Sequence, residues 1–285
     1  MKNEVGVSTH IVNSIKPEVH FGLFARYGFS LVELNLGYFP FLENAQKFRE
    51  LQDLLVRNKI RVYSFHLPYG GTVPVLGYMD ISHPDPDVRR NTIDCIRLCL
   101  DRLMILSAPC LVIHPSTGRI VNAEREDRLA LCLESLQKCL KIVRAKNCNA
   151  VPLKIALETM LPTGLLNKAS EISPFFERLN NDAAGLCLDV NHINLAGQDP
   201  IALTCQVSSR VITTHLSDND GINERHQIPR RGVIDWKQWF PAILSTGYTG
   251  PFLYESSQPA ELSDEETVAN IRKNANKLSA IIRKV

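Results

Sequence analysis

The sequence lacks the features that mark several specialised classes of protein. Its 285 residues carry a formal net charge of only +2, with an isoelectric point near 8.1, so they show no basic excess of the kind found in a dedicated nucleic-acid binder. No apolar stretch approaches the length needed to span a membrane, and the N-terminal residues contain no hydrophobic signal-peptide core. We therefore expect a cytoplasmic protein without a membrane or nucleic-acid partner.

Sequence motifs for several common chemistries are missing as well. A glycine-rich phosphate loop, a Gly-x-Ser-x-Gly elbow and a reactive-cysteine setting are all absent, which excludes those routes to phosphate binding and nucleophilic catalysis. No Cys-x-x-Cys pair occurs, because the cysteines stand singly, at Cys95, Cys99, Cys110, Cys132, Cys139, Cys148, Cys187 and Cys205. Most of them fall in expected helices or strands, so we expect reduced, buried thiols.

What the sequence does contain is a regular alternation of short apolar runs and helical patterns. The runs are rich in Val, Ile and Leu, as is typical of strands buried on both faces. They cover Val5–Ser8, Leu31–Leu36, Arg61–His66, Cys110–His114, Lys154–Glu158, Gly185–Asp189, Val211–Leu216 and Pro251–Glu255. Helical patterns include Glu43–Asn58, Ile93 to Leu103, Leu129 to Val143, Lys168–Leu179, Asp235–Ser245 and Asp264–Arg283.

Eight strand–helix units without a polar linker predict one (β/α)8 barrel domain over residues 1–285. A doubly wound open sheet is the alternative, but it does not explain why so many strands end on a side chain that can bind a metal ion. These strand-end residues are His66, His114, Glu158, Asp189, His215 and Glu255. Because a barrel gathers the C-terminal ends of its strands at one mouth, where active sites lie, we expect these side chains to form a cluster.

The sharpest set within this group is Glu158, Asp189, His215 and Glu255. Three carboxylates and one imidazole suit a divalent cation, with Mn²⁺ the preferred ion and Zn²⁺, Co²⁺ or Mg²⁺ as alternatives. For any single residue, the competing interpretation is that it caps its strand by binding backbone or an arginine. Glu33, inside a strand, also needs a partner, and we expect it to orient a ligand or touch the substrate.

Six further residues are candidates for substrate binding or for a second metal ion: His66, His114, His192, Glu224, His226 and Arg230. His66 and His114 fit a functional role and an ordinary core position equally well. His192 follows Asp189 by three residues and could instead orient a carboxylate ligand. Arg230 and Arg231 could clamp a phosphate or carboxylate of the substrate, although solvated loop arginines are the more common outcome.

The strand ends also carry a family resemblance. The segments FHLPY, VIHPS, ALET, CLDVNH, THLSDNDG, ERH, GVIDW and LYES resemble the xylose isomerase-like barrel superfamily, over nearly the whole chain. This superfamily includes sugar isomerases and epimerases, inosose dehydratases and abasic-site nucleases of the endonuclease IV type. In the sugar epimerase branch, the resemblance implies one ion held by Glu158, Asp189, His215 and Glu255. The two glutamates then serve as acid and base, and His192 contacts the substrate.

In the nuclease branch, the resemblance implies three zinc ions. By position their ligands would be His66, His114, Glu158, Asp189, His192, His215, Glu224, His226 and Glu255. Glu224 stands where an aspartate is usual in that branch. A second departure is the basic turn at Arg230 and Arg231, where relatives commonly carry a less basic, glycine-bearing turn.

We therefore predict a metal-dependent sugar isomerase or epimerase, with Glu158 and Glu255 transferring protons beside a carbonyl of a small sugar or polyol. The expected long loop Leu67–Pro86 contains no lysine or arginine, which disfavours a DNA grip. The alternatives are an endonuclease IV-like nuclease with a multi-zinc site and an inosose-type dehydratase, while a barrel that binds a metal or sugar acid without turnover is a third class. A homo-oligomer is compatible with the fold, because barrels of this kind often pair.

Overall fold

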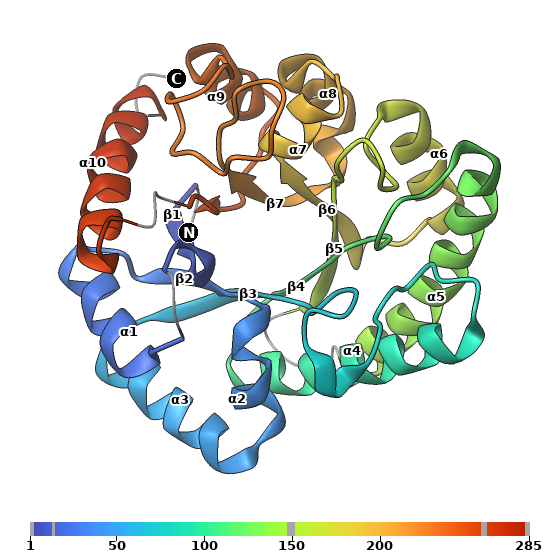
Figure 1. Cartoon of the computed structure of the whole chain (residues 1–285), viewed down its shortest axis with the longest axis horizontal. Coiled ribbons are helices and arrows are strands. Elements are labelled where there is room, and N and C mark those ends of the chain that lie inside the picture. Colours follow the sequence, from blue (N-terminus) through green and yellow to red (C-terminus); the bar gives the residue numbers. More distant parts are fainter. Residues whose placement is uncertain (1–2, 13–14, 147–151, 258–260, 283–285) are drawn as a thin grey trace.

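In the computed structural model, which describes residues 3–12, 15–146, 152–257 and 261–282, the chain forms a closed barrel. Each strand pairs in parallel with the strands before and after it, and β8 closes the barrel against β1 (Figure 1). The strands are β1 (Val5–Ser8), β2 (Leu31–Leu34), β3 (Arg61–His66), β4 (Cys110–Ile113), β5 (Lys154–Glu158), β6 (Ala184–Asp189), β7 (Val211–Leu216) and β8 (Phe252–Tyr254). The predicted (β/α)8 barrel is confirmed.

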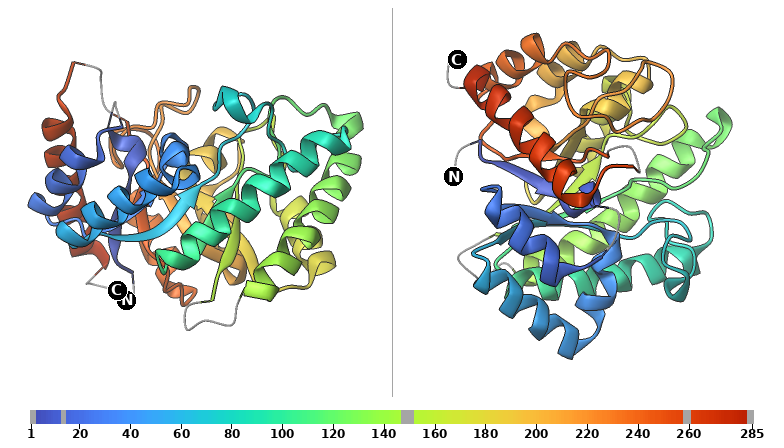
Figure 2. Two further views of the ribbon diagram at one scale, coloured as in Figure 1. Left: turned by 90° about the horizontal axis from the view of Figure 1, so that it is seen from below. Right: turned by 60° about the vertical axis from the view of Figure 1, so that its left-hand side comes forward.

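Helices surround the strands, as the two side views of Figure 2 also show. Their bounds are α1 (Pro17–Arg26), α2 (Phe39–Glu43), α3 (Ala45–Arg57), α4 (Pro86–Ile105), α5 (Arg125–Lys146), α6 (Ala169–Leu179), α7 (Val190–Leu195), α8 (Pro200–Val207), α9 (Trp236–Ser245) and α10 (Asp264–Ile282). None of these helices is long and apolar enough to cross a membrane, in a search confined to the described residues.

The strand boundaries other than that of β2 differ from the predicted ones by at most one residue, and the helices expected around Ile93 to Leu103 and Leu129 to Val143 are longer, as α4 and α5. Two boundaries differ because an asparagine side chain caps a helix there. The strand expected over 31–36 ends at Leu34, since the side chain of Asn35 accepts a hydrogen bond from the backbone N–H of Gly37 and starts a 3-10 helix. The helix expected over 43–58 is divided at Asn44, whose side chain accepts from the second and third residues of α3. Both caps change where an element ends or begins, and the order of the strands in the barrel stays as predicted.

The barrel interior below the site is filled by small side chains. Cys110, Val112, Ala156 and Cys187 form a buried cluster inside the barrel. Since side chains two residues apart in a strand share a face, Ala156 places Glu158 on the inner face, and Cys187 does the same for Asp189. Glu158 and Asp189 therefore lie one step further along the inner face of their strands than this cluster.

The cysteines are free thiols throughout the described part of the chain, as expected. Six of them are buried, whereas Cys205 on α8 is exposed. The eighth, Cys148, lies outside the described residues.

Candidate active site

Strand register brings the four-residue group together. Glu158 on β5 pairs with Cys187 on β6, two residues before Asp189, and Asp189 in turn pairs with His215 on β7. Glu255 directly follows β8. The four side chains are buried, and one ligand atom from each lies within 4.8 Å of the others.

His215 is the centre of this group. Its Nδ1 lies 3.1 Å from a Glu158 oxygen, 3.0 Å from a Glu255 oxygen and 3.9 Å from Oδ2 of Asp189. On the other side of the ring, Nε2 lies 3.0 Å from Oε1 of Glu33, which is fully buried on β2 and also accepts a hydrogen bond from Ser64 Oγ at 2.7 Å. Glu33 therefore fixes the orientation of the His215 ring.

Asp189 has two functions that use its two oxygens. Oδ1 accepts a hydrogen bond from the backbone N–H of His192 at 2.8 Å and thereby caps helix α7. Oδ2 is buried and has no hydrogen-bond partner among the described residues. A buried carboxylate oxygen without a partner is costly, so the geometry leaves this atom available for a cation.

The charges in the group shift its pKa values in opposite directions. Burial raises the pKa of Asp189 to about 6, against the attraction of His192, and the nearby Glu158 and Glu255 add to the rise. Burial also opposes ionisation of Glu158, but its contacts with His215 and His114 outweigh burial and hold its pKa well below the ordinary value. Two buried carboxylates of very different acidity, Asp189 and Glu158, therefore lie side by side at the centre of the site.

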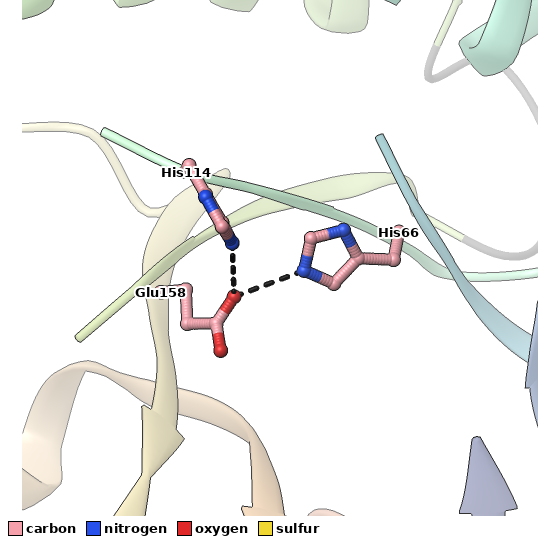
Figure 3. A group of neighbouring side chains, drawn as sticks. All are labelled: His66, His114 and Glu158. Carbon is pink, nitrogen blue, oxygen red and sulfur yellow. Dashed lines mark hydrogen bonds and ion pairs between the residues drawn. The ribbon is translucent and has the colours of Figure 1, made fainter. Parts of the chain in front are cut away.

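A second group lies on the β3–β4 side of the barrel mouth. It consists of His66, His114 and Glu158. Figure 3 shows the two imidazole rings directed at a single Glu158 oxygen: Nε2 of His66 lies 2.9 Å from it and Nε2 of His114 lies 3.1 Å from it. Tyr69 stacks on His114, with ring centroids 4.0 Å apart. Burial lowers the pKa of His114, whereas Glu158 overcomes burial at His66 and raises its pKa to about 9.

The third group combines helix α7 with the long loop after β7. One oxygen of Glu224 lies 3.0 Å from Nε2 of His192 and 2.9 Å from Nε2 of His226. Burial opposes protonation of both rings, but nearby carboxylates raise the pKa of His192 to about 10 and that of His226 to about 9. The other nitrogen of His192 faces the carbonyl oxygen of Thr159 at 3.0 Å.

A cavity of about 480 Å³ opens above these groups. Glu158 and Glu255 line it, whereas Asp189 and His215 do not and are fully buried. The two glutamates are thus the members of the four-residue group that face the cavity. The cavity volume falls within the range of small-molecule sites.

The donor set fits a divalent cation. Three carboxylates and one imidazole nitrogen converge from four strands, the free Oδ2 of Asp189 faces the others, and Glu33 orients the imidazole from behind. Oxygen-rich ligation of this kind suits Mn²⁺ or Mg²⁺ and also admits Co²⁺ or Zn²⁺.

Arg230, another of the predicted site residues, is not brought to this cavity. It lines a different one, on the outer side of the loop after β7. Arg119, whose exposed side chain follows β4, does line the site cavity, as does His10. Sequence reasoning missed Asn35, Leu36 and Met160 as wall residues. They lie one or two residues after the ends of β2 and β5, so a search of the residues just past each strand end, whatever their charge, could have found them.

Comparisons with known proteins agree with this architecture. A family model described as xylose isomerase-like TIM barrel matches residues 21–278. The chain spans about half the length of the first curated relatives that it matches, among them an inosose dehydratase of Lacticaseibacillus casei, with 26% identity over 52% of each chain. A D-psicose 3-epimerase of Ruminiclostridium cellulolyticum is 22% identical over 81% of this chain and 75% of its own. The solved structure of a D-allulose 3-epimerase from Methylomonas sp. superimposes with a TM-score of 0.80 at 18% identity, covering 98% of both chains.

Proposed function

Because the chain belongs to the xylose isomerase-like TIM barrel family, we propose that it is a divalent-metal-dependent isomerase or epimerase of a small sugar or polyol. One observation carries the proposal: Glu158 and Glu255 are members of the four-residue group and also line the cavity. A carboxylate in this position can reach both a cation and a substrate. The ketose 3-epimerases among the relatives support the same reaction class.

In this proposal the ion is held by Glu158, Asp189, His215 and Glu255, with Mn²⁺ preferred. When bound, the ion supplies Lewis-acid stabilisation of charge on substrate oxygens. Glu158 ends β5, Glu255 directly follows β8, and both face one cavity. We assign to one of them the proton that leaves the carbon beside the carbonyl, and to the other the proton that returns to the opposite face.

Neighbouring side chains orient the carboxylate of Glu158 and keep it charged. His66 and His114 both contact one oxygen of Glu158, which limits rotation of the carboxylate and keeps its charge. Tyr69 stacks on His114 and holds that ring in place. His192 lines the cavity, with Nδ1 on the carbonyl oxygen of Thr159 and Nε2 on Glu224, so it can bind a substrate hydroxyl through Nε2 only when Glu224 releases that atom.

The proposal is tested by measuring exchange of the substrate proton on the carbon beside the carbonyl. Purified protein supplied with Mn²⁺ is incubated with ketoses and polyols in deuterium oxide, and NMR follows incorporation beside the carbonyl. Glu158→Gln and Glu255→Gln should each abolish exchange and turnover, while Glu177→Gln on the exposed face of α6 serves as the matched control. Undiminished turnover in either site variant would contradict the assigned roles, and a product that has lost water would identify a dehydratase instead.

One observation favours a second candidate, an abasic-site nuclease with several zinc ions. The nine residues that the nuclease resemblance implies form three groups, and Glu158 belongs to two of them. Elemental analysis of protein purified without chelator or added metal separates the candidates. About one ion per chain supports the sugar enzyme, whereas two or three zinc ions, together with cleavage of a duplex containing an abasic site, support the nuclease.

A further inference from the structure

A second cavity lies outside the barrel mouth, between the loop after β7 and helix α10. Its volume is about 290 Å³, and polar side chains make up most of its lining. The loop contributes Arg230 and Arg231, and α10 contributes Asn270, Lys273, Asn274 and Lys277. In Figure 1 the loop, drawn in orange, runs beside the red helix α10. This cavity is separate from the one lined by Glu158 and Glu255.

The helix presents its cavity residues on one face. Lys273 and Lys277 are four residues apart, and so are Asn270 and Asn274, a spacing that places side chains on the same side of a helix. Asn274 connects the two walls, because its amide donates a hydrogen bond of 2.8 Å to the carbonyl oxygen of Pro229. The loop is therefore tied to α10 at the cavity.

The loop that carries the arginines is also fixed from inside. The fully buried carboxylate of Asp218 accepts hydrogen bonds from the backbone N–H of Arg230 at 2.9 Å and from the indole of Trp236 at 2.8 Å. Arg230 adopts a left-handed conformation with φ of 71°, which is unusual for a residue with a side chain. A Cβ at Gly232 would collide with the backbone oxygen of Asn219 and with Asp218. Hydrogen bonds and close packing thus define the backbone conformation of this turn.

The four cations of this cavity are exposed to solvent and, among the described residues, are not paired with carboxylates. None of Arg230, Arg231, Lys273 and Lys277 forms an ion pair with a carboxylate anywhere in the described ranges 3–12, 15–146, 152–257 and 261–282. The nearest acidic residue along that helix face, Glu266, is engaged by Ser263 through hydrogen bonds of 2.9 and 2.7 Å. Four like charges around one hollow repel each other weakly, because solvent and salt screen exposed charges, and a polyvalent anion bound among them is attracted to all four.

We propose that this cavity is a binding site for the phosphate group of a small anion, distinct from the substrate cavity. Arginine guanidinium groups bind phosphate oxygens in pairs, lysines supply further charge, and the two asparagine amides can donate hydrogen bonds. The cavity volume lies at the lower end of the range for small-molecule sites, which suits a phosphate ester or a free phosphate ion. The site goes beyond the proposed sugar chemistry and does not depend on it.

Titration calorimetry of the metal-loaded protein tests this site. The probes are inorganic phosphate and a hexose phosphate, at fixed ionic strength with chloride as the balancing anion. Arg231→Glu and Lys273→Glu should each weaken binding by about tenfold or more, because each reverses a charge at the cavity. Lys141→Glu is the matched control, since this exposed lysine lies on α5, away from the cavity. Should either charge reversal unfold the protein, Lys277→Glu replaces it.

The calorimetry results that support the phosphate site differ from those that exclude it. Weakened binding in the cavity variants but not in Lys141→Glu supports the site. Equal affinity for both probes then identifies the free ion as a sufficient ligand, and tighter binding of the hexose phosphate identifies an esterified one. The proposal is overturned if neither probe binds at low ionic strength, or if Arg231→Glu and Lys273→Glu bind both probes as tightly as the control. Neither readout requires catalytic turnover, so failure here is distinct from failure of the proposed sugar chemistry.

Discussion

Replacing Glu33 by glutamine tests how much a buried charge, placed behind the proposed ligand His215, contributes to the affinity for Mn²⁺. Glu33 is fully buried, and its carboxylate lies 3.0 Å from Nε2 of His215. Glutamine has the same shape and retains an acceptor oxygen for the ring N–H, so the substitution removes charge while preserving packing. We expect weaker binding of Mn²⁺ with the fold intact.

The magnitude follows from the contact that changes. A hydrogen bond to a charged group contributes about 1.5–3 kcal/mol, and one between neutral groups contributes about 0.5–1.5 kcal/mol. Their difference is about 1–1.5 kcal/mol, which corresponds to roughly a tenfold loss of affinity. Substitutions of residues that orient metal ligands commonly cost about 10–100-fold. We therefore expect Glu33→Gln to fall near the lower end of that range.

Competition titration against a chelator of known affinity measures this loss directly, with circular dichroism as the check on folding. Ser64→Ala is the matched control, because it removes the 2.7 Å hydrogen bond to the same carboxylate but leaves the charge in place. We expect a smaller loss of affinity in that variant. If Glu33→Gln bound Mn²⁺ as tightly as the parent, the inference that Glu33 supports the ligand His215 would be refuted.

Three further predictions concern other parts of the molecule. Removing divalent ions with a chelator should lower the melting temperature, because the converging carboxylates then lose their counter-charge; scanning fluorimetry with metals added back checks this. Arg119→Ala should raise KM severalfold while changing kcat by less than about twofold, as measured by steady-state kinetics, since Arg119 lies on the cavity wall and outside the proposed metal group. Burial raises the pKa of the Cys139 thiol to about 12, so at pH 8 this thiol should resist a disulfide reagent that modifies the exposed Cys205. Because an unfolded thiol ionises near pH 8.5, Cys139 should also make the fold less stable as the pH rises from about 9 toward 12, which denaturant melts can follow.

The inner part of the candidate site could be predicted from the sequence because strand geometry is local and repetitive. Side chains alternate faces along a strand, so a ligand residue two positions after an interior residue must share its face, as Glu158 does with Ala156. A closed parallel barrel then brings the strand ends to one mouth. The assembly of Glu158, Asp189, His215 and Glu255 follows from these two facts.

The position of Arg230 could not be predicted in the same way. Its loop conformation depends on Asp218 and Trp236, whose contact forms only when the loop has closed, and on Asn274 from a helix about 45 residues further along the chain. Sequence spacing carries no information on such a closure. The stacking of Tyr69 on His114 could not be predicted from the sequence either, because it joins segments that follow two different strands.

The sharing of Glu158 between two groups has a consequence for the history of such sites. One oxygen faces His66 and His114, and the other faces His215. A lineage that stopped using an ion beside His66 and His114 would still keep both histidines, because removing them would leave a buried carboxylate oxygen without partners. Their presence in a descendant therefore records a constraint of burial and does not by itself reveal how many ions an ancestor held.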